Sequence, residues 1–129
     1  MSKTEKFEDL DLWKNSRELC KVVYMYANYE LFGKDFRLRD QIRGASGSVM
    51  DNIGEGFERG GNKEFIQFLF ISKGSCGEVK SQLYSALDNA YITKLEFDLS
   101  YKIANELSIG LSNFIKYLKQ SEFKGSKYK

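Results

Sequence analysis

Apolar and small residues recur at alternating steps of three and four along four long segments of the chain. This spacing places each set on one face of an α-helix. It predicts helices at about 12–29, 36–59, 62–90 and 95–120, followed by a short basic tail at 123–129. The four sets are Leu12, Ser16, Leu19, Val23 and Tyr26; Leu38, Ile42, Ala45, Val49, Ile53 and Gly56; Phe65, Leu69, Ser72, Cys76, Val79, Leu83, Ala86 and Ala90; and Ile103, Leu107, Gly110, Leu111, Phe114 and Leu118.

Capping and turn residues separate these segments, and the chain contains no proline that would break a helix. Short turns between long helices make successive helices antiparallel neighbours. The sequence therefore predicts an all-α single domain spanning residues 1–129, an antiparallel up-down-up-down four-helix bundle. The boundary signals are Asp9 or Asp11, the turn 33–35 with Asp35 as cap, the stop at Gly60 and Gly61, Asn62 as cap, and a capping box from Thr93 to Glu96.

Glycines are unusually frequent inside the predicted helices. Each costs about 1 kcal/mol relative to alanine, so seven of them forgo roughly 7 kcal/mol, comparable to the net stability of a small domain. Close approach of another helix, or of a partner, to the backbone would offset this loss. The seven are Gly44, Gly47, Gly54, Gly56, Gly74, Gly77 and Gly110.

Several of these glycines share a second face with apolar residues. At about 100° per residue, this face points away from the core side of the two middle helices. The pattern predicts a subunit interface that would cover Phe70, and the alternative is that the glycines relieve crowding within one chain. The predicted interface residues are Gly47, Met50, Gly54, Ile66, Phe70, Gly74 and Gly77.

Basic side chains gather on the first helix and at the start of the second. The chain has 20 basic and 18 acidic residues, a net charge of +2, so its composition does not indicate a nucleic-acid-binding protein. Their local placement nevertheless predicts a surface for nucleic acid or an acidic partner, with an ordinary solvated face as the alternative. These residues are Lys14, Arg17, Lys21, Arg37, Arg39 and Arg43.

The residue types exclude most catalytic sites. Without histidine the chain cannot form a Ser-His-Asp or Cys-His site. Asp51, Glu55 and Glu58 lie off the core face, where a solvated acidic edge is the simpler interpretation, and Glu55 is spaced for an ion pair with Arg59. We predict no catalytic residue, metal, cofactor or small-molecule substrate. We expect buried free thiols at Cys20 and Cys76 and, since neither a signal peptide nor a membrane segment is evident, a cytoplasmic location without membrane contact.

Several motifs occur in an order that resembles a known family. They are Leu12-Trp13-Lys14, Gln41 to Ala45, Asn52 to Gly56, Phe65 to Leu69, and Lys73-Gly74-Ser75 with Glu78. They resemble the bacterial four-helix bundle proteins encoded in intervening sequences of 23S ribosomal RNA genes. The residues that best fit the motif of this family are Asn52, Glu55, Gly56, Arg59, Gly74 and Ser75.

This resemblance implies a left-turning bundle that assembles as a ring, a homopentamer. Most members of the family have no established activity. A relative, the accessory protein of diversity-generating retroelements, binds a reverse transcriptase and RNA through a basic surface. The chain departs from the family pattern at Gly54, where alanine is usual, and at Gly44 and Gly47, where arginine and a larger residue are common. The missing arginine at position 44 weakens the inference of nucleic-acid binding.

The sequence therefore predicts a non-enzymatic, homo-oligomeric helical scaffold that binds a macromolecule. RNA, DNA or a nucleic-acid-processing enzyme such as a reverse transcriptase is the expected partner. One alternative is a protein-only assembly factor that binds an acidic protein. The other is a carboxylate metalloenzyme built on Asp51, Glu55 and Glu58.

Overall fold

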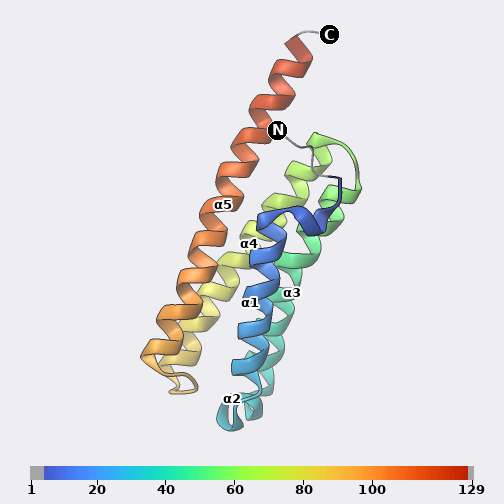
Figure 1. Cartoon of the computed structure of the whole chain (residues 1–129). Coiled ribbons are helices and arrows are strands. Elements are labelled where there is room, and N and C mark those ends of the chain that lie inside the picture. The colour runs from blue at the N-terminus through green and yellow to red at the C-terminus, as the bar shows by residue number, and fades with distance from the viewer. Residues whose placement is uncertain (1–4, 128–129) are drawn as a thin grey trace.

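The computed structural model describes residues 5–127, with side chains described for residues 5–121. The long helices alternate in direction, because α1 and α4 run one way and α3 and α5 the other (Figure 1). In this all-α up-down-up-down bundle, α3 packs against α1 and α4, and α5 packs against α4 and α1. The elements are η1 (Phe7–Asp9), α1 (Asp11–Ala27), α2 (Glu30–Lys34), α3 (Phe36–Glu58), α4 (Asn62–Asp88) and α5 (Lys94–Lys127).

The core faces of α3 and α4 follow the predicted stripes. Every predicted core position of α3 is buried, and the stripe of α4 is buried from Phe65 to Ala86. Ala90 was wrongly placed on this face. It is exposed and has a positive φ of 59°, because α4 ends at Asp88 and the chain turns there into the loop before α5.

The core face of α5 is rotated from the predicted one. Ala104 and Ile115 are buried, whereas the predicted positions Ile103, Gly110 and Phe114 are only half-buried. α5 has apolar residues on both sides of its central stripe, because it packs against two neighbours, α1 and α4. Periodicity alone therefore did not identify the centre of the face.

Several predicted boundaries were also wrong. Residues 30–34 form the short helix α2, where only a turn at 33–35 was expected. Gly61, not Asn62, is the N-cap of α4, and Leu10 precedes α1 without a side-chain cap. α5 continues past residue 120 to Lys127, past the turn between α3 and α4 (Figure 1). The side chains of the predicted basic tail, and residues 128–129 altogether, lie outside the described part.

Two predicted capping carboxylates, Asp35 and Glu96, lie at one end of the bundle, at the starts of α3 and α5. Asp35 accepts the backbone N–H of Leu38 at 3.1 Å, as expected for the start of α3. The capping box of α5 is also confirmed. The N–H of Thr93 donates to a carboxylate oxygen of Glu96 at 2.8 Å, and the N–H of Glu96 donates to the Thr93 hydroxyl at 3.1 Å. At each helix start these bonds satisfy backbone donors that the helix geometry leaves free.

Tyrosines from other segments bind the same two caps. The hydroxyl of Tyr91 donates to Asp35 at 2.8 Å, and the hydroxyl of Tyr29 donates to the carboxylate of Glu96. Tyr26 donates to the backbone carbonyl of Glu96 at 3.0 Å. Backbone N–H groups, and then these hydroxyls, lower the pKa of both carboxyls, while the bond to Glu96 raises the pKa of Tyr29 to about 12. The tyrosines therefore tie the ends of α1 and α4 to the starts of α3 and α5.

Acid is expected to destabilise the protein through these caps. A carboxyl whose pKa is lower in the folded chain than its unfolded value of about 4 stabilises the fold above that value, and this contribution is lost as the pH falls through the folded pKa. A double variant, Asp35→Asn with Glu96→Gln, should melt at a lower temperature at neutral pH and lose less on acidification. Melting curves followed by circular dichroism between pH 7 and pH 3 measure this. The exposed Glu106→Gln control should keep the wild-type pH profile.

At high pH the sign reverses for Tyr29. Its folded pKa of about 12 lies above the unfolded value of about 10, so its contribution is present below pH 10 and is lost as the pH rises through the folded pKa.

In the acid experiment, an equal loss of stability in the wild type and in the double variant would contradict the stabilising role of the Asp35 and Glu96 caps.

Within residues 5–127, no helix is both long enough and apolar enough to cross a lipid bilayer.

A candidate binding groove between α1 and α3

The basic residues of α1 lie on its exposed side, as the sequence predicted. Lys14, Arg17 and Lys21 are all exposed. Lys21 forms an ion pair with Glu18 at 3.2 Å, and the guanidinium of Arg17 lies 5.9 Å from the ring centre of Trp13. These three side chains present positive charge along one helix.

The three arginines at the start of α3 have different surroundings. Arg37 is exposed. The guanidinium of Arg39 forms an ion pair with Asp40 at 2.9 Å and donates to the carbonyl oxygen of Gly33 at 3.3 Å, and the second bond closes the turn between α2 and α3. The third, Arg43, contacts α1 instead. The predicted basic set is therefore not one continuous surface.

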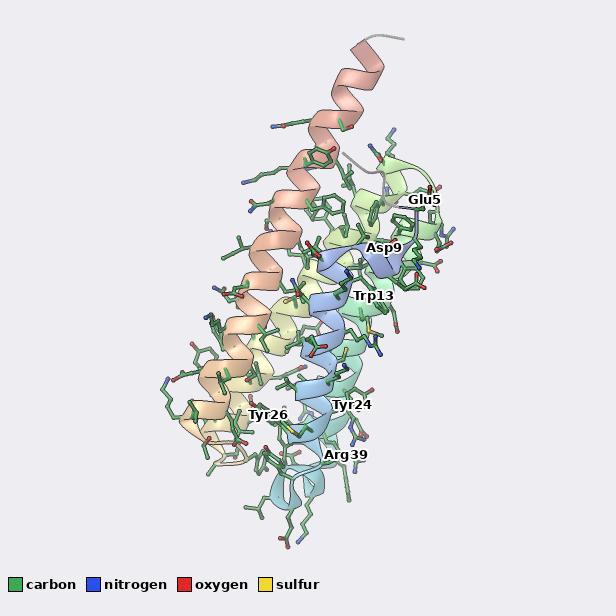
Figure 2. All side chains as sticks on the ribbon, viewed as in Figure 1. Glu5, Asp9, Trp13, Tyr24, Tyr26 and Arg39 are labelled. Atoms are coloured by element: carbon green, nitrogen blue, oxygen red, sulfur yellow. The ribbon has the colours of Figure 1, made fainter. Side chains whose placement is uncertain are left out.

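Arg43 stacks on an aromatic ring of α1. Its guanidinium lies 5.2 Å from the ring centre of Tyr24 and donates to the side-chain oxygen of Asn28 at 2.6 Å. Both partners are neutral, so neither of these contacts compensates the positive charge of Arg43. Tyr24 is 45% exposed, and Figure 2 shows it on the same side of the molecule as Arg39. The result is an accessible aromatic ring with a cation on it.

A groove of about 390 Å³ lies between α1 and α3, with Tyr24 of α1 and Gly47 of α3 in its walls. It brings Arg17 and Lys21, predicted to bind a partner, next to Gly47 and Met50, predicted to lie in a subunit interface. The sequence had assigned the two pairs to different surfaces. The lining residues are Arg17, Cys20, Lys21, Tyr24, Gly47, Met50 and Asp51.

A second groove, of about 320 Å³, continues the first and shares Met50 and Asp51 with it. Its walls are aromatic, because Phe7 and Trp13 meet edge to face with their ring centres 5.1 Å apart. Its rim is acidic. The lining residues are Phe7, Trp13, Met50, Asp51, Gly54, Glu55 and Glu58. We call the groove lined by Arg17, Lys21 and Tyr24 the basic half and the groove lined by Trp13, Glu55 and Glu58 the acidic half; Asp51 lines both. Figure 2 labels Trp13 and Tyr24.

Gly54 does not lie on an outer face. It is buried, and a Cβ atom placed on it would lie 3.8 Å from the ring of Phe7. The prediction of an exposed Gly54 failed because η1 folds back over α3. Phe7, Trp13 and Tyr24 were not predicted as site residues. Apart from their aromatic character, the sequence has no local signal that places them beside α3.

Three of the four carboxylates of α3, Asp51, Glu55 and Glu58, line the acidic half of the groove. Glu55 forms the predicted ion pair with Arg59 at 2.9 Å. Among the described residues no group of three or more histidine, cysteine, aspartate or glutamate side chains is placed to hold a metal ion. Asp51 and Glu58 thus contribute charge to the groove, and the geometry gives no support to a carboxylate metal centre.

Both cysteines are free. Cys76 is buried as predicted, whereas the prediction was wrong for Cys20, which is half-buried and lines the groove. Burial raises the pKa of the Cys76 thiol to about 11 and also raises the pKa of Cys20, which is only half-buried. Each thiol donates to a backbone carbonyl at 3.1 Å, Cys20 to Ser46 and Cys76 to Ala104. A protonated, hydrogen-bonded thiol is a poor nucleophile.

The outer face of α4 has both apolar and open positions. Phe70 is 47% exposed and Ile66 is half-buried. Gly74 and Gly77 are exposed, and Cβ atoms placed on them would meet nothing within 4 Å. Crowding within the chain therefore does not explain these two glycines, nor Gly47, which is equally open.

Two of the family-motif residues, Gly56 and Ser75, pack α3 against α4, and Asn52 bonds within α3 to the serine that Ser75 contacts. The side chain of Asn52 donates to the carbonyl oxygen of Ser48 at 2.8 Å, and the hydroxyl of Ser75 donates to the Ser48 hydroxyl at 2.9 Å. A Cβ atom on Gly56 would lie only 2.7 Å from the Cβ of Phe68. Small residues thus allow the two helices to approach closely at this seam.

A family model described as 23S rRNA-intervening sequence protein matches residues 8–113, which is most of the chain. The chain belongs to this family. The chain also resembles, in fold, a crystal structure of a protein with unknown function from the S23 ribosomal protein family of Bacteroides thetaiotaomicron VPI-5482. The two chains are 23% identical, with a TM-score of 0.75 over 81% of this chain and 98% of that one. No curated protein matches the chain.

Proposed function

We propose that this protein is a non-enzymatic, homo-oligomeric scaffold that binds RNA or DNA in the basic half of the groove between α1 and α3. The supporting observation is that Arg17 and Lys21 line the same groove as Tyr24, whose ring is stacked on Arg43. Cations neutralise phosphates, and an accessible aromatic ring offers a surface on which a base can stack. An acidic protein would also pair with the cations, but the ring beside them gives a base a stacking surface, so we favour nucleic acid.

The glycines support the homo-oligomeric part of the proposal. Gly74 and Gly77 sit in α4 with no neighbour within 4 Å of a Cβ position. Each forgoes about 1 kcal/mol of helix stability without a compensating contact in its own chain. Contact with another copy would offset that cost and cover Phe70. We propose a closed ring, with five copies as the number that the family resemblance implies.

Binding is expected to be salt-sensitive and to depend on Tyr24. A labelled single-stranded RNA or DNA titrated by fluorescence anisotropy should bind less tightly as salt rises, and Arg17→Ala or Lys21→Ala should each reduce the salt slope by about 0.7. Tyr24→Ala should weaken binding by about 1–3 kcal/mol, the usual contribution of one stacked base. Tyr24→Phe keeps the ring and should bind as the wild type does, and Lys102→Ala, an exposed lysine of α5, serves as the charge control.

Absence of salt-sensitive binding at low micromolar protein would remove the nucleic-acid proposal. Capture of an acidic protein in its place, with affinity that depends on Arg17 and Lys21 but not on the Tyr24 ring, would favour the protein-only assembly factor.

A further inference from the structure

The acidic half of the groove has an apolar interior and excess negative charge. Phe7, Trp13 and Met50 form its walls. Of its carboxylates, Glu55 is paired with Arg59, whereas Asp51 and Glu58 have no cation within 4 Å among the described residues. The chemistry that fits such a groove is an apolar knob accompanied by a positive charge.

The surface formed by α4 and α5 has such a knob. Phe70 is 47% exposed, and the ammonium of Lys119 lies 5.0 Å from its ring centre. Lys73 and Lys116 are exposed on the same two helices. Gly74 follows Phe70 by one turn and has open space where a side chain would lie, so another backbone can approach there.

The knob and the groove lie near the same end of the bundle. Phe65 contacts Phe57 of α3 and Phe114 of α5, with ring centres 6.0 and 5.5 Å apart, which places these parts of the three helices at one height. Glu58 follows Phe57 in α3. In α4, Phe70 lies five residues after Phe65, and in α5, Lys119 lies five residues after Phe114. In Figure 1 this is the end at which α3 turns into α4.

We infer that Phe70 and Lys119 of one copy dock into the groove formed by Trp13, Asp51 and Glu58 of a second copy. The contact is heterologous, because different patches meet, and heterologous contacts close into rings when the rotation permits. A ring around an axis parallel to the helices keeps equivalent points at equal heights, as the positions of knob and groove require. This inference rests on the proposed homo-oligomer and names the two halves of its interface.

A charge exchange tests the contact directly. Lys119→Glu alone and Glu58→Lys alone each place like charges together and should raise the dissociation constant of the assembly roughly tenfold or more. The double variant restores opposite charges and should recover assembly. Lys102→Glu is the matched control, because this exposed lysine of α5 lies roughly 25 Å along the helix from Lys119, and it should assemble as the wild type does. Native mass spectrometry across a dilution series measures all four.

The single tryptophan provides a second measurement. Trp13 lines the groove, so its emission should shift to the blue as the protein assembles, and Phe70→Ser should abolish this shift while the helical circular dichroism is retained. An assembled wild type whose single charge variants assemble equally well would overturn the knob-and-groove contact and leave the proposed scaffold standing. So would a double variant that fails to recover. A wild type that stays monomeric at all concentrations would overturn both this contact and the homo-oligomeric scaffold. Nucleic-acid binding is tested separately by the Tyr24 variants.

Discussion

Replacing Phe32 with alanine is expected to lower the free energy of unfolding by about 3–5 kcal/mol, the usual cost of emptying a buried phenylalanine site. Phe32 belongs to a helix of only five residues, yet its side chain is fully buried. Its ring stacks on Tyr91 with ring centres 5.3 Å apart, and Tyr91 in turn donates to the Asp35 cap. The substitution would remove packing beneath the start of α3 and loosen the turn that precedes it.

The neighbouring residue provides the control. Leu31 lies in the same short helix but is 61% exposed, so Leu31→Ala should change stability by less than about 0.5 kcal/mol. Urea unfolding at fixed protein concentration, followed by circular dichroism, compares the two variants. Similar losses for both would mean that α2 stabilises the bundle through its backbone and not through Phe32.

Replacing Gly56 with alanine is expected to lower the free energy of unfolding by about 1–3 kcal/mol, as overpacking of a core does. A Cβ atom at this position would lie 2.7 Å from the Cβ of Phe68 and 2.8 Å from the ring of Phe65. The Cβ of Phe68 is fixed to the backbone and cannot rotate away. α3 and α4 would therefore have to separate at the seam where Ser48 and Ser75 bond.

Gly44 in the same helix should respond in the opposite direction. It is exposed, and nothing lies within 4 Å of its Cβ position, so Gly44→Ala should raise the stability by about 1 kcal/mol through helix propensity alone. Thermal or urea unfolding of both variants measures the difference. Stabilisation of the chain by Gly56→Ala would show that the seam can widen without cost.

The long helices could be predicted because burial of one face dominates their energetics. In α3 and α4 every predicted core residue is buried apart from Ala90, and the structure also buries Ser46, Gly54 and Ser75. The capping box at Thr93 was equally predictable, since its two hydrogen bonds involve residues close in sequence. Local chemistry and periodicity were sufficient for these features.

The features that the sequence failed to predict depend on contacts between distant residues. Gly54 looked like an exposed position on a helical wheel, and only the return of Phe7 over α3 buries it. The segment around Gly33 looked like a turn, but burial of Phe32 stabilises a helix there. Tertiary contacts of this kind override local preference.

The candidate groove shows the same division. The exposed sides of Lys14, Arg17 and Lys21 followed from angular position along one helix. That Arg17 and Lys21 share a groove with Gly47 depends on how α1 lies against α3, and the stacking of Arg43 on Tyr24 depends on the same packing. A single sequence does not specify which residues of two helices face each other.

The tyrosine–carboxylate contacts make the two ends of the bundle mechanically different. Tyr29 and Tyr91 hold the starts of α5 and α3 at one end. At the other end, within the described residues, Gly60 and Gly61 join α3 to α4, and η1 lies on α3 through the ring of Phe7. The hydrogen bonds at the first end oppose sliding of α1 along α5 and of α4 along α3. At the second end, in the described part of the chain, the helices are held by ring and backbone packing around Gly56 and Phe65 in place of such bonds.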